Sequence, residues 1–315
     1  MKRVILDCDP GIDDALAIIL AVKSKKLQIE GITTVSGNTT IENSTKNTLK
    51  ILTLLHQEKI AVYKGEEKPL KREPIYASGV HGEDGLAENN LDESNIDYRK
   101  ESAIDFIISH ILSNPNKITL VATGPLSNIA KSILKKPEIC SKIEKLIIMG
   151  GTIFKPGNIK PHAEFNIYFD PDAAQIVFNS EINNIILVPL DITHKVIFTP
   201  NLLNRIEKKE ENEEVTLSGF IYKIINFNYK FYMTRKRFDG CPLHDPLAIG
   251  VAIDPSFVDT EPMYIKVLTD DIFRGQIFAK FNKENYQKES NLKVNVSLKV
   301  DSERFMKYFI DTLNS

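Results

Sequence analysis

The sequence contains no tryptophan, and only three of its 315 residues are cysteines, namely Cys8, Cys140 and Cys241. Their spacing fits neither a disulfide framework nor a metal site, which is typical of a protein from a reducing compartment. No apolar run approaches the length of a membrane span, and Asp7 and Asp9 interrupt the apolar start too early for a signal peptide. We therefore expect a cytoplasmic protein that has no contact with a membrane.

An excess of charge of one sign is also missing, because the formal net charge is only −2 and both signs are dispersed. Without a basic tract or a basic amphipathic segment, nucleic acid and membrane surfaces are not expected partners. The mixed run "KKEENEE" at 208–214 is predicted to be a solvated helix end or loop. Hydrophobic residues make up 42% of the chain, so a large core is possible. Because no linker or internal repeat is visible, we expect one domain over residues 1–315.

Short apolar runs rich in Val and Ile alternate with helical patterns along most of the chain. Strands are predicted at 4–9, 30–38, 60–65, 117–125, 145–151 and 184–191, and helices from Asp13 and over 41–57, 102–112, 126–135 and 170–180. The C-terminal third is predicted to add helices at 216–232, at 246–253 and from Ser302, and strands at 263–268, 275–281 and 292–298. This alternation predicts the α/β class, with an open, mostly parallel, Rossmann-like sheet flanked by helices.

Four aspartates, Asp7, Asp9, Asp13 and Asp14, are crowded into the stretch "DCDPGIDD" after the first predicted strand. Asp7 and Asp9 would point to one face of the strand end, while Asp13 and Asp14 fall in the first turn of a helix. Each one alone is more simply a helix cap or a solvated side chain. Together their mutual repulsion favours a bound cation at the carboxyl end of the sheet, and hard oxygen ligands favour Ca²⁺ or Mg²⁺ over Zn²⁺.

Other polar residues are predicted at or after strand ends on the same side of the sheet. Asn38 and Thr123 alone would usually be turn residues, and His244 alone would usually be structural. Their shared position favours a functional site, and the set comprises Asn38 in "VSGN", Thr123 in "VATGP", Glu164 and Asn166 in "AEFN", and His244 and Asp245 in "PLHDP".

These motifs together resemble the inosine-uridine-preferring nucleoside hydrolases. The stretch "DCDPGIDDALAI" resembles the N-terminal signature of that family, and "GITTVSGN", "HGEDG", "ATGPLSNIA", "IIMGG", "AEFNIYFDPDAA", "DITHK" and "HDPLA" follow in the family's order. The resemblance implies hydrolysis of the N-glycosidic bond of ribonucleosides to ribose and free base, with bound Ca²⁺, in nucleoside salvage. It also implies assembly into a homodimer or homotetramer.

The resemblance assigns a role to each matching residue. Asp9, Asp14, the Thr123 carbonyl and Asp245 would hold Ca²⁺, Asp9 would take the proton of the attacking water, and Asp7 would support them from behind. The ribose would be bound by Asp13, Asn38, Asn158, Glu164 and Asn166, with Met149 lining the pocket, while His81 and His244 would flank the base. His244 would be the acid for the leaving base. Carboxylates near the ribose would stabilise an oxocarbenium-like transition state.

The lack of tryptophan also bears on the base, because one purine-preferring branch of the family stacks its substrate between tryptophans. His244 fits the branch that accepts uridine and often inosine, so we expect uridine or cytidine first and inosine second. Upstream of His244, Tyr229 and Tyr232 are each as compatible with the helix core as with base contact. We include Tyr232 among the substrate-binding residues.

Two other functions are compatible with parts of this pattern. The first is a nucleoside-binding or sensor protein that uses the same scaffold without catalysis. The second is a Mg²⁺-dependent phosphatase, since "ILDCDPG" carries a DxD motif after a strand. Such phosphatases usually have Thr or Val where this chain has Gly11, and they leave Asp13 and Asp14 unexplained. Release of sugar from nucleosides would separate the hydrolase from both.

Overall fold

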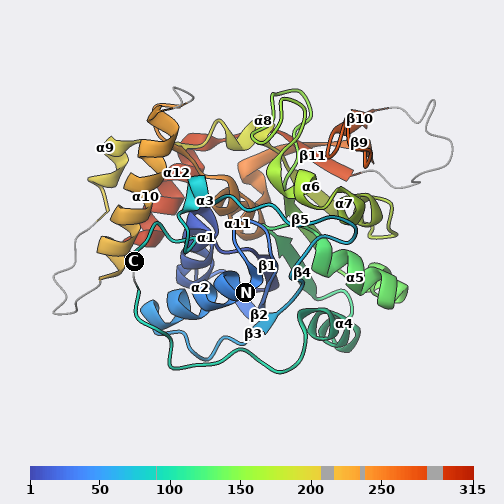
Figure 1. The fold of residues 1–315 in the computed structure, drawn as a ribbon, viewed down its shortest axis with the longest axis horizontal. Coiled ribbons are helices and arrows are strands. Elements are labelled where there is room, and N and C mark those ends of the chain that lie inside the picture. The colour runs from blue at the N-terminus through green and yellow to red at the C-terminus, as the bar shows by residue number, and fades with distance from the viewer. Residues whose placement is uncertain (90, 207–215, 235–237, 282–293) are drawn as a thin grey trace.

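The computed structural model describes residues 1–89, 91–206, 216–234, 238–281 and 294–315, so the run at 208–214 lies outside the described residues. The described residues form a nine-stranded sheet with the order β10–β9–β11–β6–β5–β4–β1–β2–β3 (Figure 1). Its strands are β1 (Lys2–Cys8), β2 (Leu27–Thr34), β3 (Val62–Lys64), β4 (Ile118–Ala122), β5 (Lys145–Met149), β6 (Ile185–Val188), β9 (Val258–Val267), β10 (Ile277–Lys280) and β11 (Val294–Val300).

The sheet is mostly parallel. From β3 to β11 each strand pairs with its neighbour in parallel, and only β9 and β10 add antiparallel pairs at one edge. The central order β3–β2–β1–β4–β5–β6 is that of a doubly wound sheet, whose connections reverse direction between β1 and β4. The prediction of an open, mostly parallel α/β sheet is therefore confirmed. Strands from both ends of the chain share this sheet.

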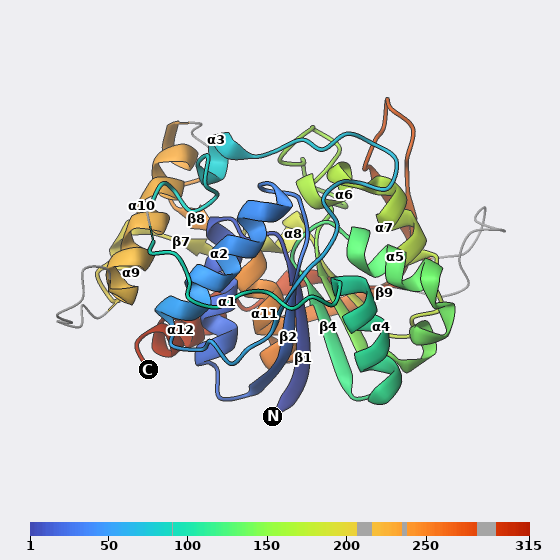
Figure 2. The same cartoon turned by 60° about the horizontal axis from the view of Figure 1, so that its bottom comes forward.

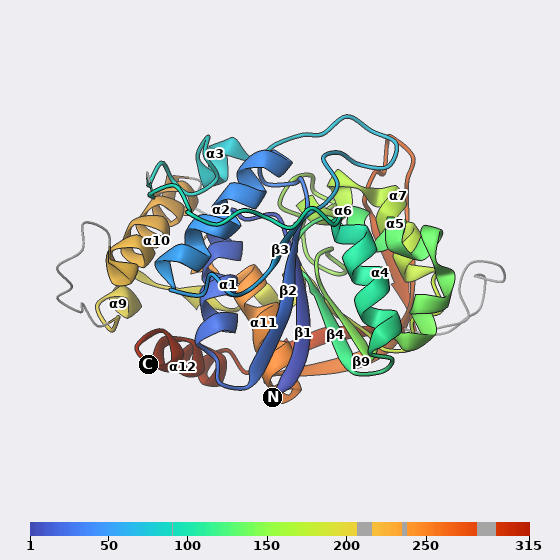
Figure 3. The same cartoon turned by 90° about the horizontal axis from the view of Figure 1, so that it is seen from below.

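Helices cover both faces of the sheet (Figure 3). One layer contains α1 (Ile12–Lys23), α2 (Ile41–Leu54), α10 (Leu217–Thr234), α11 (His244–Ile253) and α12 (Ser302–Leu313), and the other contains α4 (Ala103–Ser113), α5 (Ser127–Lys135) and α7 (Pro171–Phe178). Side chains of β1 alternate between the two cores, since Val4 and Leu6 pack into the first and Ile5 into the second. Continuous apolar strands are thus explained by burial on both faces.

Several short elements escaped the sequence analysis because they have too few residues to show a period. They are the helices α3 (Ser78–His81), α6 (Phe165–Phe169), α8 (Leu190–Thr193) and α9 (Pro200–Leu203), and the strand pair β7 (Ile197–Phe198) and β8 (Cys241–Pro242). Figure 2 shows α3 at the end of the sheet opposite the N-terminus, beyond the carboxyl end of β1. Within the described ranges, no helix is long and apolar enough to cross a membrane.

Candidate active site

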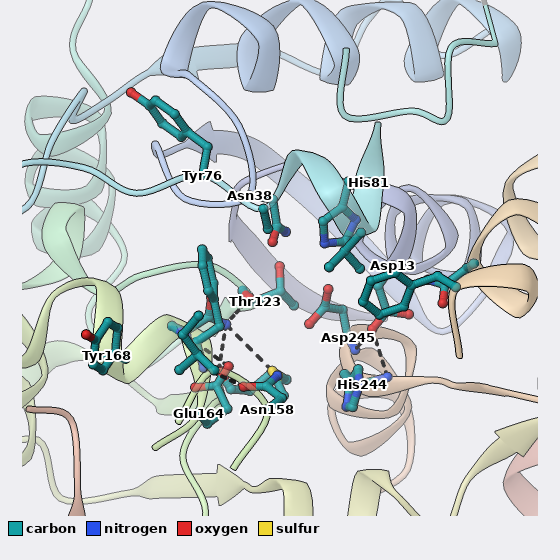
Figure 4. A pocket seen from close by; sticks show the side chains of 18 of the residues that line it. Asp13, Asn38, Tyr76, His81, Thr123, Asn158, Glu164, Tyr168, His244 and Asp245 are labelled. Carbon is teal, nitrogen blue, oxygen red and sulfur yellow. Dashed lines mark hydrogen bonds between the residues drawn. The ribbon is translucent and has the colours of Figure 1, made fainter. Parts of the chain in front are cut away.

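A cavity of about 520 Å³ lies beyond the carboxyl ends of β1, β4 and β5, where the strand order reverses. Its size suits a small-molecule ligand, and its place is where doubly wound sheets bind ligands. All residues predicted to bind substrate line it, together with three predicted metal or catalytic positions (Figure 4). This lining includes Asp13, Asn38, His81, Thr123, Met149, Asn158, Glu164, Asn166, Tyr232, His244 and Asp245.

Asp9, which follows β1, is fully buried and is absent from the described lining of the cavity. Its Oδ2 accepts a 2.6 Å hydrogen bond from the backbone N–H of Asn38, whereas its Oδ1 has no partner among the described residues. Burial, followed by repulsion from Asp14, raises the pKa of the Asp9 carboxyl well above its ordinary value. An unpartnered, buried carboxylate oxygen of this kind calls for a proton or a cation.

Asp14 and Asp7 also lie behind the cavity wall. Asp14 accepts hydrogen bonds from the Thr123 hydroxyl at 2.8 Å and from the Asn38 amide at 3.1 Å, and burial raises its pKa. Asp7 Oδ1 accepts from the Thr33 hydroxyl at 2.6 Å and the Asn128 amide at 2.7 Å, and burial raises the pKa of Asp7 to about 6. Asp7 therefore links β1 to β2 and α5, which suits the supporting position predicted for it.

Asp13 brings the two ends of the sequence together at the cavity. Its Oδ2 accepts the backbone N–H groups of His244 at 2.8 Å and of Asp245 at 3.0 Å, so it caps the first turn of α11. This contact explains why α11 begins at His244 rather than at Pro246. Burial first, and the charge of Asp14 next to it, raise the pKa of Asp13 to about 8. Burial and Asp14 likewise raise the pKa of Asp245 well above its ordinary value.

Glu164 and Asn166 build the opposite wall from the start of α6. The Glu164 carboxylate accepts the N–H groups of Gly151 at 2.8 Å and Asn166 at 2.9 Å, and burial raises its pKa. The Asn166 amide donates to the Thr123 carbonyl at 2.6 Å, and Asn158 Oδ1 accepts from Phe165 N–H at 2.9 Å. The side chains predicted to hold ribose therefore also hold this wall together.

The two histidines occupy different walls of the cavity. His81 Nδ1 accepts the backbone N–H of Ile12 at 3.0 Å, and burial lowers the pKa of His81 to about 4. His244 Nδ1 lies 2.7 Å from the Thr193 hydroxyl, and its Nε2 lies 3.5 Å from the Tyr232 hydroxyl. Burial, followed by the nearby His194, lowers the pKa of His244 well below its ordinary value. In its neutral form each imidazole can donate through one nitrogen only.

Sequence reasoning missed several residues of the cavity, including Tyr76, Tyr168, Phe231 and Asn228. Asn228 lies four residues before Tyr232 on α10, and that helical spacing was the signal that could have found it. Its Oδ1 is buried without a partner in the described part of the chain. The sequence is compatible with a place in the helix core or with base contact for both Tyr229 and Tyr232. In the structure, Tyr232 lines the cavity, whereas Tyr229 packs against the core.

The donor set is suited to a hard divalent cation. Carboxylates and a carbonyl are the ligands that Ca²⁺ prefers, and the unpartnered Asp9 Oδ1 could receive such an ion. Among the described residues, no three His, Cys, Asp or Glu side chains are already arranged as metal ligands. Asp14 shares its oxygens with Thr123, Asn38 and Gly11.

A doubly wound sheet with carboxylates, amides and two histidines around a cavity at its switch point is typical of an enzyme that acts on a polar small molecule. The sequence profile of the inosine-uridine preferring nucleoside hydrolases matches residues 4–307, and the chain belongs to this family.

Two relatives and one solved structure illustrate the range of the family. An inosine-uridine preferring nucleoside hydrolase of Crithidia fasciculata is 34% identical over 99% of this chain and 97% of its own length. A pyrimidine-specific ribonucleoside hydrolase of Klebsiella pneumoniae is 35% identical over 98% and 96%. The structure of a purine-preferring ribonucleoside hydrolase from Gardnerella vaginalis superimposes with a TM-score of 0.91 at 32% identity, covering 99% of this chain and 98% of that one. The chain is therefore a hydrolase that acts on the N-glycosidic bond of ribonucleosides, as predicted.

Proposed function

We propose that this protein is a Ca²⁺-dependent ribonucleoside hydrolase of nucleoside salvage that cleaves uridine or cytidine first and inosine second. The observation that carries the proposal is the cavity, because residues from widely separated motifs line it together. Carboxylate and amide groups on its walls suit the hydroxyl groups of ribose. A site built to bind a 2′-hydroxyl would discriminate against deoxyribose, because the missing group leaves buried polar atoms unpaired.

The cation would be held by the carboxylates of Asp9, Asp14 and Asp245 and by the carbonyl of Thr123. When bound, it would supply positive charge that offsets their repulsion and makes a nearby water more acidic. Asp9 would accept the proton of the attacking water, because a carboxylate beside the cation is a base within reach of it. Asp13 is the alternative acceptor, since its carboxyl reaches the cavity.

The ribose would lie against Asp13, Asn38, Asn158, Glu164 and Asn166, with Met149 on the wall of the cavity. The carboxylates of Asp13 and Glu164 would stabilise the positive charge that develops on the sugar as the glycosidic bond breaks. The base would lie between the walls that carry His81 and His244. His244 would assist its departure by donating from Nε2, next to the hydroxyl of Tyr232.

Three further parts of the proposal concern the base preference, the cellular location and the assembly. The base preference rests on the absence of tryptophan and on His244 and Tyr232, because the relatives include both pyrimidine-specific and purine-preferring enzymes. The cytoplasmic location rests on the sparse cysteines, all of which are free and buried. Assembly into a homodimer or homotetramer rests on the family resemblance alone.

A nucleoside sensor without catalysis has less support than a hydrolase, because the chain belongs to the nucleoside hydrolase family. The phosphatase has less support as well. Asp7, the first aspartate of its DxD motif, is fully buried behind the wall and bonded to Thr33 and Asn128. It is therefore not placed to attack a substrate in the cavity.

The decisive experiment measures the release of reducing sugar from uridine, cytidine, inosine and 2′-deoxyuridine. Each assay is run on untreated protein, after treatment with a Ca²⁺ chelator, and after Ca²⁺ is restored. We expect release from the ribonucleosides, fastest with uridine or cytidine, loss after chelation and recovery with Ca²⁺. Sugar release that continues after chelation would contradict the dependence on Ca²⁺. Faster release from inosine than from uridine and cytidine would contradict the proposed base preference. Binding of uridine without release of sugar would favour the sensor.

A further inference from the structure

The "DITHK" motif begins in the short helix α8, which follows β6, and none of its side chains has a role in the proposal above. Asp191 accepts the backbone N–H groups of Ile153 at 2.8 Å and Phe154 at 2.7 Å, and Leu190 N–H donates to the Gly151 carbonyl at 2.9 Å. These bonds anchor α8 to the segment after β5. The last residue of the helix, Thr193, is therefore held in a fixed place.

Thr193 is fully buried, and its hydroxyl lies 2.7 Å from Nδ1 of His244. Within the described ranges, this imidazole nitrogen is the one hydrogen-bond partner found for the Thr193 hydroxyl. A neutral imidazole carries its proton on either Nδ1 or Nε2, and the hydrogen bond made by one nitrogen determines the state of the other. The direction of this one hydrogen bond therefore decides whether Nε2, the other nitrogen of His244, carries the proton.

The two directions differ in how they treat the hydroxyl hydrogen of Thr193. If Nδ1–H donated to the hydroxyl oxygen, the hydroxyl hydrogen would be buried with no acceptor, which is unfavourable. If the hydroxyl donates to Nδ1, its hydrogen is satisfied and the proton of His244 must be on Nε2. The second arrangement leaves Nε2–H directed away from α8, beside the Tyr232 hydroxyl on the cavity wall.

We propose that Thr193 is a positioning residue that holds His244 as the Nε2–H tautomer, so that this nitrogen can donate a hydrogen bond to the departing base and stabilise the negative charge that develops on it. The inference rests on the role of His244 in the proposed function, and it assigns to Thr193 no contact with substrate. The hydroxyl acts through a single hydrogen bond, so a side chain of the same shape without a hydroxyl should leave the cavity intact and lose the tautomer control.

The test compares Thr193→Val with Thr193→Ser, since valine keeps the shape and serine keeps the hydroxyl. Substrates are uridine and p-nitrophenyl riboside, whose leaving group departs without help from a hydrogen-bond donor. For Thr193→Val we expect kcat on uridine to fall about tenfold, less than the 10²–10³-fold that removal of a preorganised donor can cost, with KM and kcat on p-nitrophenyl riboside unchanged. Thr193→Ser should stay within about twofold of wild type on both. Equal losses on both substrates, or wild-type turnover of uridine by Thr193→Val, would overturn the inference.

A second measurement does not depend on the variants. Nitrogen-15 NMR of the imidazoles in the wild-type protein reports the tautomer of each of the six histidines, and His244→Gln assigns the His244 signals. We expect the proton on Nε2, and a proton on Nδ1 would refute the inference even if Thr193→Val does not fold. Failure of the proposed function looks different, because the wild-type protein would then release no sugar from any ribonucleoside.

Discussion

Replacing His81 with asparagine should remove a large part of the sensitivity of this fold to acid. The His81 ring is buried at the cavity wall, and its Nδ1 accepts the N–H of Ile12 at the start of α1. The contact is tight, because a Cβ at Gly11 would lie 2.5 Å from this nitrogen. A protonated ring could not accept that hydrogen bond. Asparagine keeps an acceptor oxygen but does not titrate in this range.

The direction of the effect follows from the two states of the ring. The pKa of His81 is about 4 in the folded protein against an ordinary value of 6.5, so between these values the unfolded chain binds more protons. Stability contributed by the neutral ring is therefore present at neutral pH and is lost as the pH falls from 6.5 toward 4. Because the pKa of His81 is 6.5 in the unfolded chain and about 4 in the folded protein, the free energy of unfolding should fall by about 2 kcal/mol between pH 7 and pH 5.

Urea unfolding at pH 5, 6 and 7, in the presence of a chelator, measures this loss directly. The free energy of unfolding of His81→Asn should fall by about 2 kcal/mol less than that of wild type between pH 7 and pH 5. His56→Asn is the matched control, since His56 is exposed and has φ of 53°, a conformation that asparagine tolerates. It should follow the wild-type curve. A His81→Asn curve parallel to wild type would refute the assignment of a low pKa to His81.

Three further predictions concern the site and its support. Asp9→Asn should lower kcat on ribonucleosides about 10²–10⁴-fold while circular dichroism shows a folded protein, and retained activity would leave Asp13 as the proton acceptor. His244→Ala should slow inosine far more than p-nitrophenyl riboside, and equal losses on both would remove its role as acid. Arg72→Gln should lower the free energy of unfolding by about 2 kcal/mol in urea, because Arg72 pairs with the buried Asp172 and donates to the Thr269 carbonyl. The exposed Lys71 binds the same carboxylate, so Lys71→Ala should change stability by less than about 0.5 kcal/mol, and equal effects would contradict this reasoning.

Much of the fold was predictable because its information is local. The apolar runs and helical periods gave the strands and long helices, and the doubly wound class follows from their alternation. The short elements α3, α6 and α8 were not predictable in this way, since each is stabilised by contacts to other segments. Glu164 illustrates this, because it begins α6 by accepting N–H groups from Asn166 and from Gly151.

The amino-acid sequence by itself determined which chemistry is available: aspartates at the end of the first strand, and amides and histidines after later ones. Tertiary structure decided which of these groups meet. It set Asp13, rather than Asp9, against the cavity and joined it to His244, 231 residues further along the chain. It also placed Thr193 under the imidazole of His244. The physical reason is that local spacing fixes which side of a strand or helix a residue lies on, whereas strand order and packing between layers fix what lies opposite.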